Sequence, residues 1–450
     1  MTNKKLPPIA GDKSPILNHL LKFKASPYEF IKKHRDNLGG IFSFKLFNRI
    51  FYVLSDPEHI KHVLVSNSKN YSRKKSYEFL EEMLGKGLLT TVGEEWKKRR
   101  RIAQPAFYKE QLKGIVQEME RSIKQCMNEW DSSTTVNKDL YHEMNEIALT
   151  VLCNSIIKTD VVEKLPVIKQ SLLDSLHYLS KKRFKAFKFL HRLPSKTKTV
   201  GQKGIKTLKE IVLKIIEDRR ESGSQQDDLL AMLMASTDEE TSSSLTNEEL
   251  LDEVMTIFIA GHDTTAVVLT WATYLIGTHP EVEQKIREEI NQYMKGDEVD
   301  LNDLRNFTYT KMVVQEVLRL YPPVWTFGRK AINDDDINGF HVPANTSCTM
   351  PAILTHRSKE HWEKPDEFYP EHFLPEATKK RTKYAYFPFG GGQHLCIGEH
   401  FAMIEIQLAI IHILKKFNVK ISTQEPVEME MLITLKPKNK INVQFEKRIN

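Results

Sequence analysis

Apolar residues recur every three to four positions through most of the chain from residue 56 to residue 320, and again beyond residue 396. This spacing places them along one face of a helix and predicts a mostly helical chain. The clearest helical segments are 112–130, 205–219, 280–293, 300–320 and 397–417.

Short apolar runs separated by turn residues predict strands in three places. Residues 40–54 are expected to form a hairpin that turns at Asn48-Arg49, and Ser55-Asp56-Pro57 then opens a helix. The pattern therefore predicts a single, mainly α domain over residues 1–450, with a small β region. The β region comprises 40–55, 329–350 and 419–445, and the helical portion comprises 56–320 and 397–417.

One predicted helix is unusually long. Thr246 and Glu249 form a capping box, and helical spacing continues to His279-Pro280. That is about 32 residues, or roughly 48 Å. From Val254 onward the helix is apolar nearly all round, so it is expected to run through the core. His262 and Asp263 interrupt its apolar run, which argues against a membrane span.

Composition narrows the class of protein. Of 450 residues, 40% are hydrophobic and 28% are charged, as in an ordinary globular chain. The 66 Lys and Arg exceed the 59 Asp and Glu by seven, too mild an excess to indicate nucleic-acid binding. Four dispersed cysteines do not suggest a disulfide framework, and the first residues lack the apolar core of a secretion signal. A cytoplasmic location is expected.

The segment from Phe387 to Gly398 carries the most informative chemistry. Three consecutive glycines precede Cys396, and a helix is expected to start near Ile397. Glycines allow backbone conformations and close approaches that side chains block, and a helix start stabilises a thiolate. Cys396 is a buried structural cysteine, a nucleophile, or a thiolate ligand held against a flat cofactor.

This segment resembles the haem-thiolate signature of the cytochrome P-450 family, F-x-x-G-x-[RH]-x-C-x-G. The resemblance implies that Cys396 is the axial ligand of the iron of haem b. It also implies that the haem lies between the long helix and the Cys396 loop. The signature residues that would contact the haem are Phe389, Gly392, His394 and Gly398, with His394 facing a propionate.

A second motif lies on an apolar helix that ends in Leu320-Tyr321-Pro322-Pro323. Glu316 and Arg319 share one face of this helix and are expected to be buried, where an ion pair needs further hydrogen bonds. The pair resembles the E-x-x-R motif of the same family. A third member of that cluster would be His372, at a position where the family commonly has arginine.

The third motif, residues 260–265, interrupts the long helix with glycine, an acid and two threonines. Such residues are unfavourable in an apolar helix, and a local conflict of this kind indicates either a kink or a functional site. The motif resembles the family's oxygen-activation sequence. Thr264 would then hydrogen-bond dioxygen and Asp263 would relay protons, while Ala260 and Gly261 leave room for the haem.

Basic residues at two further places resemble the family's propionate contacts. Trp96 and Arg100 match W-x-x-x-R, and Arg329 follows the Pro323–Gly328 segment where another such arginine occurs. Alone, each is also compatible with surface charge. Lys97, Lys98, Arg99 and Arg101 flank Arg100 and are expected to attract an acidic electron-transfer partner.

The resemblance implies a monooxygenase that uses dioxygen and two electrons to hydroxylate or epoxidise a small apolar substrate, such as a fatty acid, a terpenoid or another lipid-like molecule. Because no flavin or ferredoxin domain is recognisable, we expect a separate donor of the ferredoxin or flavodoxin type with its reductase, and a monomeric enzyme. A peroxide-driven peroxygenase and a non-catalytic haem sensor or carrier are the alternatives. Neither needs the Asp263–Thr264 pair.

Residues 181–198 contain eight Lys or Arg and no acid among 18 residues, interleaved with phenylalanines. Basic amphipathic segments of this kind can lie on an anionic membrane surface. The segment is therefore expected either to make peripheral membrane contact or to cover the substrate pocket.

Overall fold

The computed structural model describes residues 5–10, 22–23, 25–46, 49–130, 135–157, 164–183, 195–223 and 228–448. The chain divides into two units. Unit 1 comprises Met1–Ser76, Gln315–Cys396 and Met429–Lys436, and unit 2 comprises Tyr77–Val314, Ile397–Glu428 and Pro437–Asn450. Most of the predicted 181–198 segment lies outside the described residues.

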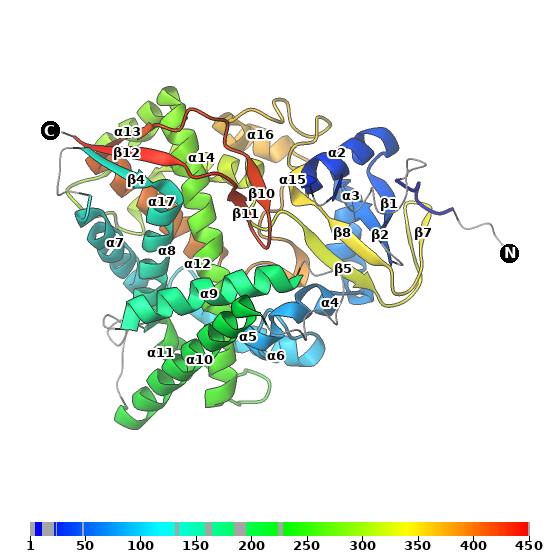
Figure 1. Ribbon diagram of the computed structural model, residues 1–450, viewed down its shortest axis with the longest axis horizontal. Coiled ribbons are helices and arrows are strands. Elements are labelled where there is room, and N and C mark those ends of the chain that lie inside the picture. Colours follow the sequence, from blue (N-terminus) through cyan, green and yellow to red (C-terminus); the bar gives the residue numbers. More distant parts are fainter. Residues whose placement is uncertain are drawn as a thin grey trace. The chain divides into compact units, whose positions relative to one another are not determined.

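Unit 1 is built on a five-stranded sheet of strand order β1-β2-β8-β5-β3. Its strands are β1 (Ile41–Leu46), β2 (Arg49–Leu54), β3 (Tyr71–Ser72), β5 (Phe327–Ala331) and β8 (Ser347–Met350). The β1–β2 hairpin is antiparallel, with Ile41 opposite Leu54, whereas β8 pairs with β2 in parallel. Figure 1 shows the blue N-terminal strands beside the yellow strands that follow much later in the chain.

Unit 1 also contains short helices and two hairpins. The helices of unit 1 are α2 (Pro27–Leu38), α3 (Pro57–Lys61), α4 (Lys74–Tyr77), α15 (Ala352–Thr355) and α16 (Pro375–Lys380), and its hairpins are β6 (Asp335–Ile337) with β7 (Phe340–Val342) and β10 (Met429–Met431) with β11 (Leu435–Pro437). The Asp56 side chain caps α3 by accepting from the Glu58 N–H, as the sequence predicts.

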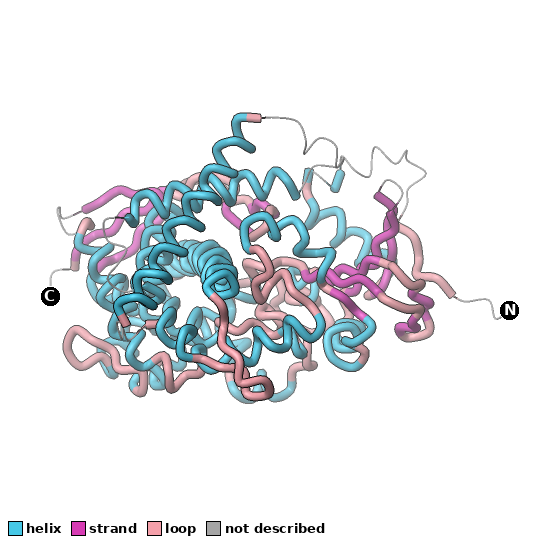
Figure 2. The backbone as a smooth tube through the Cα atoms, turned by 90° about the horizontal axis from the view of Figure 1, so that it is seen from below, coloured by secondary structure: helices cyan, strands magenta, loops and turns pink. Residues whose placement is uncertain are grey.

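Unit 2 is mostly helical (cyan in Figure 2) and has α12 (Asn247–Thr278) at its core. The other helices are α5 (Glu81–Leu84), α6 (Gly93–Ala103), α7 (Lys113–Asn128), α8 (Leu140–Ile157), α9 (Leu165–Arg183), α10 (Lys196–Ser222), α11 (Leu229–Ala235), α13 (Pro280–Tyr293) and α17 (Glu399–Lys416). A three-stranded sheet, β4 (Thr135–Asp139), β12 (Asn442–Lys447) and β9 (Phe417–Ile421), completes the unit. Helix α14 (Thr308–Leu320) begins in unit 2 and ends in unit 1.

The long predicted helix is confirmed. Both hydrogen bonds of the Thr246–Glu249 capping box are present, and α12 ends at Thr278. Among the described helices, α12 alone is long and apolar enough to cross a membrane by length and composition, and 78% of its most apolar window is buried within the protein. Its apolar surface is therefore accounted for by core packing, in part against α8.

The predicted helix over 300–320 is wrong in its first third. A 3-10 turn, Asp303–Asn306, is followed by a break at the fully buried Phe307, and α14 then begins at Thr308. The Glu289 carboxylate explains the new start, because it accepts hydrogen bonds from the N–H groups of Tyr309 and Thr310 at 2.6 and 2.8 Å. A cap from a distant helix is not visible in local sequence.

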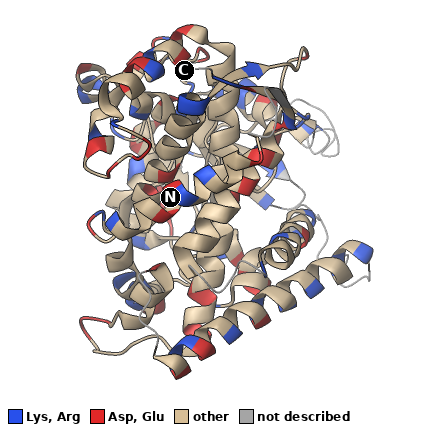
Figure 3. Cartoon of the chain, turned by 90° about the vertical axis from the view of Figure 1, so that its left-hand side faces the viewer, with Lys and Arg blue, Asp and Glu red and all other residues tan. Residues whose placement is uncertain are grey.

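Charged residues are dispersed over the helices. In Figure 3, basic and acidic positions are both spread over the helices that this view shows. This arrangement agrees with the mild net charge of the sequence.

Candidate functional site

The loop that carries Cys396 is folded by its own backbone. The Gly390 N–H donates to the Phe387 carbonyl and the Cys396 N–H donates to the Phe389 carbonyl, each at 3.0 Å. Gly392 has φ +66°, and a Cβ there would collide with the Leu64 carbonyl. Glycine is required at this position for its backbone angle and for close approach to a neighbouring segment of unit 1.

Cys396 differs from the other three cysteines in its exposure. Cys396 is exposed, Cys126 is half-buried, and Cys153 and Cys348 are buried. Burial raises the pKa of all three other thiols, that of Cys348 to about 12. A raised pKa opposes formation of the thiolate that binds a metal. Exposure therefore singles out Cys396 as the cysteine whose thiolate a cofactor could use.

The helix that follows is suited to a thiolate and to a flat ligand. Gly398 is the N-cap of α17, so Cys396 lies just before the positive end of an 18-residue helix. Apart from Gly398 itself and its two chain neighbours, no described residue has an atom within 4 Å of the position that a Gly398 Cβ would occupy. The Cys396 thiol and the open space beside Gly398 at the start of α17 fit the haem that the sequence motif implies.

The middle of α12 is accessible at a few positions only. Ala260 is exposed and Gly261 and Thr264 are half-buried, whereas Asp263 and most residues of the flanking turns are buried. The Thr264 hydroxyl donates to the Ala260 carbonyl at 2.7 Å. This bond keeps the hydroxyl on the helix surface, on the face where Ala260 is exposed.

Asp263 points toward α8. The Tyr141 hydroxyl donates to Asp263 Oδ1 at 3.1 Å, and Tyr141 itself is half-buried. This bond helps to offset the cost of burying a carboxyl group in an apolar helix. Sequence reasoning missed Tyr141 because the two residues are far apart in the chain.

The structure gives Gly261 a role in helix packing. A Cβ on Gly261 would lie 2.9 Å from Leu152 Cδ1 of α8. The missing side chain therefore lets α8 approach α12, and Ala260 is the residue of the pair that leaves surface exposed.

Glu405 of α17 is a buried acid that sequence reasoning also missed. It is 1% exposed, and burial raises its pKa well above the usual range, opposed only by a hydrogen bond from the Thr265 side chain. Its Oε1 has no hydrogen-bond partner among the residues that the structure describes. Burial therefore favours the protonated form of Glu405, whose carboxyl group is bonded to the residue that follows Thr264.

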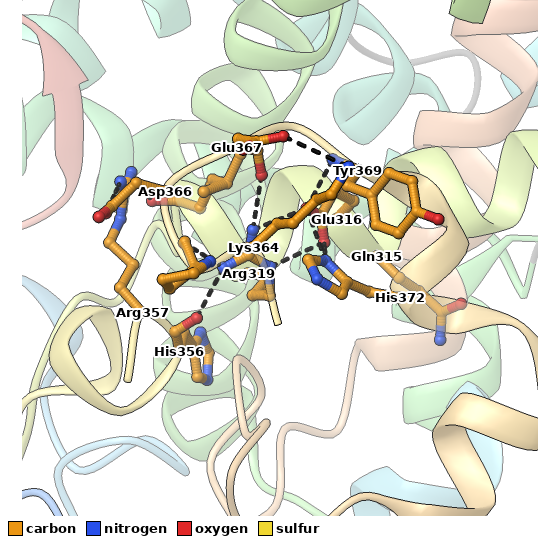
Figure 4. Close-up of polar contacts among 12 residues, drawn as sticks. Gln315, Glu316, Arg319, His356, Arg357, Lys364, Asp366, Glu367, Tyr369 and His372 are labelled. Carbon is orange, nitrogen blue, oxygen red and sulfur yellow. Dashed lines mark hydrogen bonds and ion pairs between the residues drawn. The ribbon is translucent and has the colours of Figure 1, made fainter. Parts of the chain in front are cut away.

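Glu316 and Arg319 form the buried ion pair that the sequence predicts, and both are fully buried (Figure 4). Arg319 donates to both Glu316 oxygens at 2.8 and 2.7 Å. Its remaining N–H groups bond to the carbonyls of His356, Pro365 and Glu367. The guanidinium is thus satisfied on every side, which a buried ion pair requires.

His372 completes this cluster. Its Nδ1 lies 3.1 and 3.2 Å from the two Glu316 oxygens. Burial would raise the pKa of Glu316, but hydrogen bonds from Arg319 and His372 outweigh it and hold that pKa below its usual value. Glu316, Arg319 and His372 therefore form one hydrogen-bonded cluster in unit 1.

An arginine outside the motif joins the cluster from the loop after α16. The Arg381 guanidinium lies 4.3 Å from the centre of the Trp362 ring and 4.6 Å from that of Phe373, and it donates to the His372 carbonyl. The Arg319 guanidinium lies 4.9 Å from the same Trp362 ring. Arg381 therefore brings a second guanidinium to a cluster in which His372 takes the position that arginine commonly holds in the family.

The arginines that are expected to contact the haem propionates make other hydrogen bonds in this structure. Arg100 Nε donates to Gln104 at 2.8 Å, and the buried Arg329 donates to the Gly328 carbonyl at 2.9 Å. Trp96 is buried and His394 is half-buried. Each of these four side chains carries an N–H group, which is the donor that a propionate contact needs.

The expected basic docking cluster is wrong in part. Arg99 is 3% exposed and pairs with Glu253 at 3.0 Å, so it belongs to the core of unit 2. Arg101 pairs with the buried Asp238 and with Glu240 at 2.6 and 3.1 Å. Lys97 is exposed beside Glu94, and Lys98 is half-buried.

The predicted site residues form two sets, one in each unit. Unit 1 contains Glu316, Arg319, Arg329, His372, Phe389, Gly392, His394 and Cys396. Unit 2 contains Trp96, Arg100, Ala260, Gly261, Asp263, Thr264 and Gly398.

Comparisons with known proteins identify the family of this chain. A family model described as Cytochrome P450 matches residues 7–445. The chain is 29% identical to cytochrome P450 4d2 of Drosophila melanogaster, over 96% of this chain and 92% of that protein. It is 27% identical to cyclooctat-9-en-7-ol 5-monooxygenase of Streptomyces melanosporofaciens, over 90% of this chain and 88% of that protein.

A solved structure has the same fold. The crystal structure of the cytochrome P450DA heme domain aligns with a TM-score of 0.84 at 24% identity, covering 98% of this chain and 94% of that chain. This likeness confirms the mainly α fold with small sheets that the sequence predicts.

Proposed function

The chain belongs to the cytochrome P450 family and is a haem-thiolate monooxygenase, and from this premise we propose that Cys396 supplies the axial thiolate. The observation that carries the proposal is that Cys396 alone among the four cysteines is exposed. The Cys396 N–H bond to Phe389 and the start of α17 support it, because both favour a fixed thiolate. When bound, haem activates dioxygen with electrons from a redox partner.

The spectrum of the reduced, carbon monoxide-bound protein tests the ligand. The wild type should show the red-shifted Soret band typical of thiolate ligation, and Cys396→His should lose that shift. Cys126→Ala, at a half-buried cysteine, is the matched control and should keep it. A wild-type spectrum in Cys396→His would overturn the assignment.

We propose that Asp263 and Thr264 deliver protons to the reaction site. Thr264 is half-buried on the accessible face of α12, and Asp263 is held by the half-buried Tyr141 hydroxyl. Tyr141 precedes the exposed His142, so it lies near the surface while its hydroxyl contacts the buried acid. In this arrangement Asp263 holds the proton and Thr264 presents it on the accessible face.

We propose that Trp96, Arg100, Arg329 and His394 bind the haem propionates. Two guanidinium groups, an indole N–H and an imidazole provide donors for two carboxylates. Arg100 is half-buried, and its Nε donates to the Gln104 side chain. Arg100→Gln should lower haem content, measured as the ratio of Soret to protein absorbance, more than Lys97→Gln.

The enzyme acts on an apolar substrate, and we propose a lipid-like molecule such as a terpenoid or fatty acid. The relative from Streptomyces acts, by its name, on a cyclic unsaturated alcohol. In unit 1, Trp325, Ile353, Met431 and Leu435 form an apolar cluster, and Trp325 Nε1 donates to the Leu432 carbonyl at 3.1 Å. By the family resemblance, residues 324–327 and 431–433 would lie at the substrate pocket, and this cluster contains Trp325 of the first segment and Met431 of the second. Soret shifts on titration with terpenoids, fatty acids and polar analogues test the class.

A redox partner supplies the electrons, and we propose a separate acidic carrier of the ferredoxin or flavodoxin type that docks on a monomeric enzyme. Leu395, 40% exposed beside Cys396, and the exposed Lys97 are the supporting features. Charge reversal at Lys97 should slow reduction at low salt, and Lys380→Glu serves as a control. Rates insensitive to salt and to both variants would contradict an acidic partner.

We propose a cytoplasmic enzyme that contacts anionic membrane through residues 181–198. The composition of the segment supports this, although Lys182 pairs with Glu82 at 2.6 Å and is not available for lipid. Co-sedimentation with anionic vesicles should therefore weaken in Lys185→Glu with Lys188→Glu. Binding that is unchanged in this double variant would leave the pocket-cover alternative.

A further inference from the structure

His356 lies directly after α15 and is completely buried in unit 1. Its ring packs against Tyr386 and Phe387, with ring centres 5.3 and 5.2 Å apart. The Phe387 N–H donates a hydrogen bond to His356 Nε2 at 2.9 Å. The His356 side chain therefore contacts both the ring and the backbone N–H of Phe387, which is the first residue of the glycine-rich loop.

The hydrogen bond fixes the protonation state of His356. Because Nε2 accepts, the ring is neutral and its proton is on Nδ1. Burial, together with the nearby Arg319 guanidinium, agrees with this state, since they lower the pKa of His356 to about 3. An imidazolium could not accept from the Phe387 N–H.

The backbone of His356 is held independently of its ring. Arg319 Nη1 donates to the His356 carbonyl at 2.8 Å, and Arg319 is in turn held by both Glu316 oxygens (Figure 4). One residue thus links the buried ion pair to the loop. Its carbonyl is fixed by Arg319, and its ring fixes Phe387.

From Phe387 the bonds continue to Cys396. The Phe387 carbonyl accepts from Gly390, and the Phe389 carbonyl accepts from Cys396. Phe387 is 3% exposed, and its backbone N–H donates to His356 Nε2. Removal of that acceptor would leave the buried Phe387 N–H without this partner. A buried unsatisfied N–H is costly, so the loop would shift to satisfy it.

We propose that His356 is a positioning residue for the Cys396 thiolate, acting through its Nε2 bond to the Phe387 N–H. Packing alone would require only a ring-sized apolar side chain. The bond requires an acceptor at the place of Nε2. The proposal rests on the proposed role of Cys396 as the axial ligand.

Two polar substitutions separate these requirements. The glutamine oxygen in His356→Gln can reach the place of Nε2, whereas the asparagine oxygen in His356→Asn reaches only the place of Nδ1. His361→Asn, at a half-buried histidine of the same segment, is the control. The measurements are haem content, the rate at which the thiolate-type carbon monoxide spectrum decays, and hydrogen exchange of the Phe387 amide.

We expect His356→Asn to accelerate the decay and the Phe387 exchange by about 10- to 100-fold, as for loss of one buried hydrogen bond. His356→Gln should remain within about threefold of wild type, because it restores the acceptor. Equal behaviour of the two variants, or unchanged Phe387 exchange in His356→Asn, would overturn the proposal.

A measurement on the wild type covers the case in which neither variant folds. NMR of isotope-labelled histidine should show the Nδ1–H tautomer at His356, and the Nε2–H tautomer would overturn the proposal. Failure of the Cys396 assignment is recognised separately, because Cys396→His would then keep the wild-type spectrum while Phe387 exchange still reports the His356 bond.

Discussion

The Tyr141 hydroxyl donates a hydrogen bond to Asp263 Oδ1 across 3.1 Å, and this bond joins α8 to the middle of α12. Asp263 is 5% exposed, whereas Tyr141, whose hydroxyl donates to it, is half-buried. The contact gives the buried acid of the oxygen-activation motif a defined orientation.

Tyr141→Phe should therefore misplace Asp263 without disturbing the fold. We expect about three- to tenfold less product per electron consumed, as for loss of one hydrogen bond to a carboxylate. Substrate-induced Soret shifts should be unchanged. Tyr108→Phe, at an exposed tyrosine, is the control. Unchanged coupling in Tyr141→Phe would show that this bond does not serve proton delivery.

Thr264→Ala should separate electron use from product formation. Among the residues that the structure describes, the Thr264 hydroxyl bonds only to the Ala260 carbonyl, so alanine preserves the helix while it removes the group that presents a proton. Haem and substrate binding should remain, and most reducing equivalents should appear as hydrogen peroxide or water. The measurement is product and peroxide formed per electron donor oxidised.

Thr270 offers a matched control on the same helix. Its hydroxyl makes the same bond, to the Ala266 carbonyl at 2.7 Å, but Thr270 is fully buried. Thr270→Ala should leave coupling intact. Equal uncoupling in both variants would mean that helix perturbation, and not the Thr264 hydroxyl, is responsible.

Local signals in the sequence predicted those elements whose ends are determined locally. The capping box begins α12 where expected, and Pro280 begins α13. The break at Phe307 was not predictable, because the carboxylate that caps α14 comes from Glu289 in another helix. Local pattern cannot report a hydrogen bond made between distant segments.

The same distinction holds in the site. Cys396 and the Glu316–Arg319 pair lie in motifs with fixed spacing, so sequence alone singles them out as candidates. Tyr141 and Glu405 act through contacts with distant helices, and a lone glutamate in an amphipathic helix is typical of a solvated face. At Gly261 the structure adds a packing reason that the local sequence does not show, which is the close approach of Leu152.

Arg381 should contribute to the stability of unit 1 because it adds a guanidinium beside Trp362 and a bond to the His372 carbonyl. We expect Arg381→Met to lower the free energy of unfolding by about 1–3 kcal/mol, through lost cation–π and hydrogen-bond interactions. Denaturant unfolding followed by tryptophan fluorescence measures this. Lys380→Met, at the exposed end of α16, should change it little, and equal effects of the two variants would contradict the role of Arg381.

Glu405→Gln should change how stability depends on pH. Burial keeps the proton on native Glu405 at a pH where the unfolded carboxyl, with its ordinary pKa of 4.5, has lost it. The native state then binds more protons, so the free energy of unfolding falls as pH rises above 4.5 toward the raised native pKa. Glutamine is neutral throughout, so its advantage over glutamate should be small at about pH 5 and should grow by about pH 8 in denaturant unfolding. Glu363→Gln, at an exposed glutamate, should show no such trend, and a Glu405→Gln difference that stays constant between the two pH values would mean that native Glu405 is ionised.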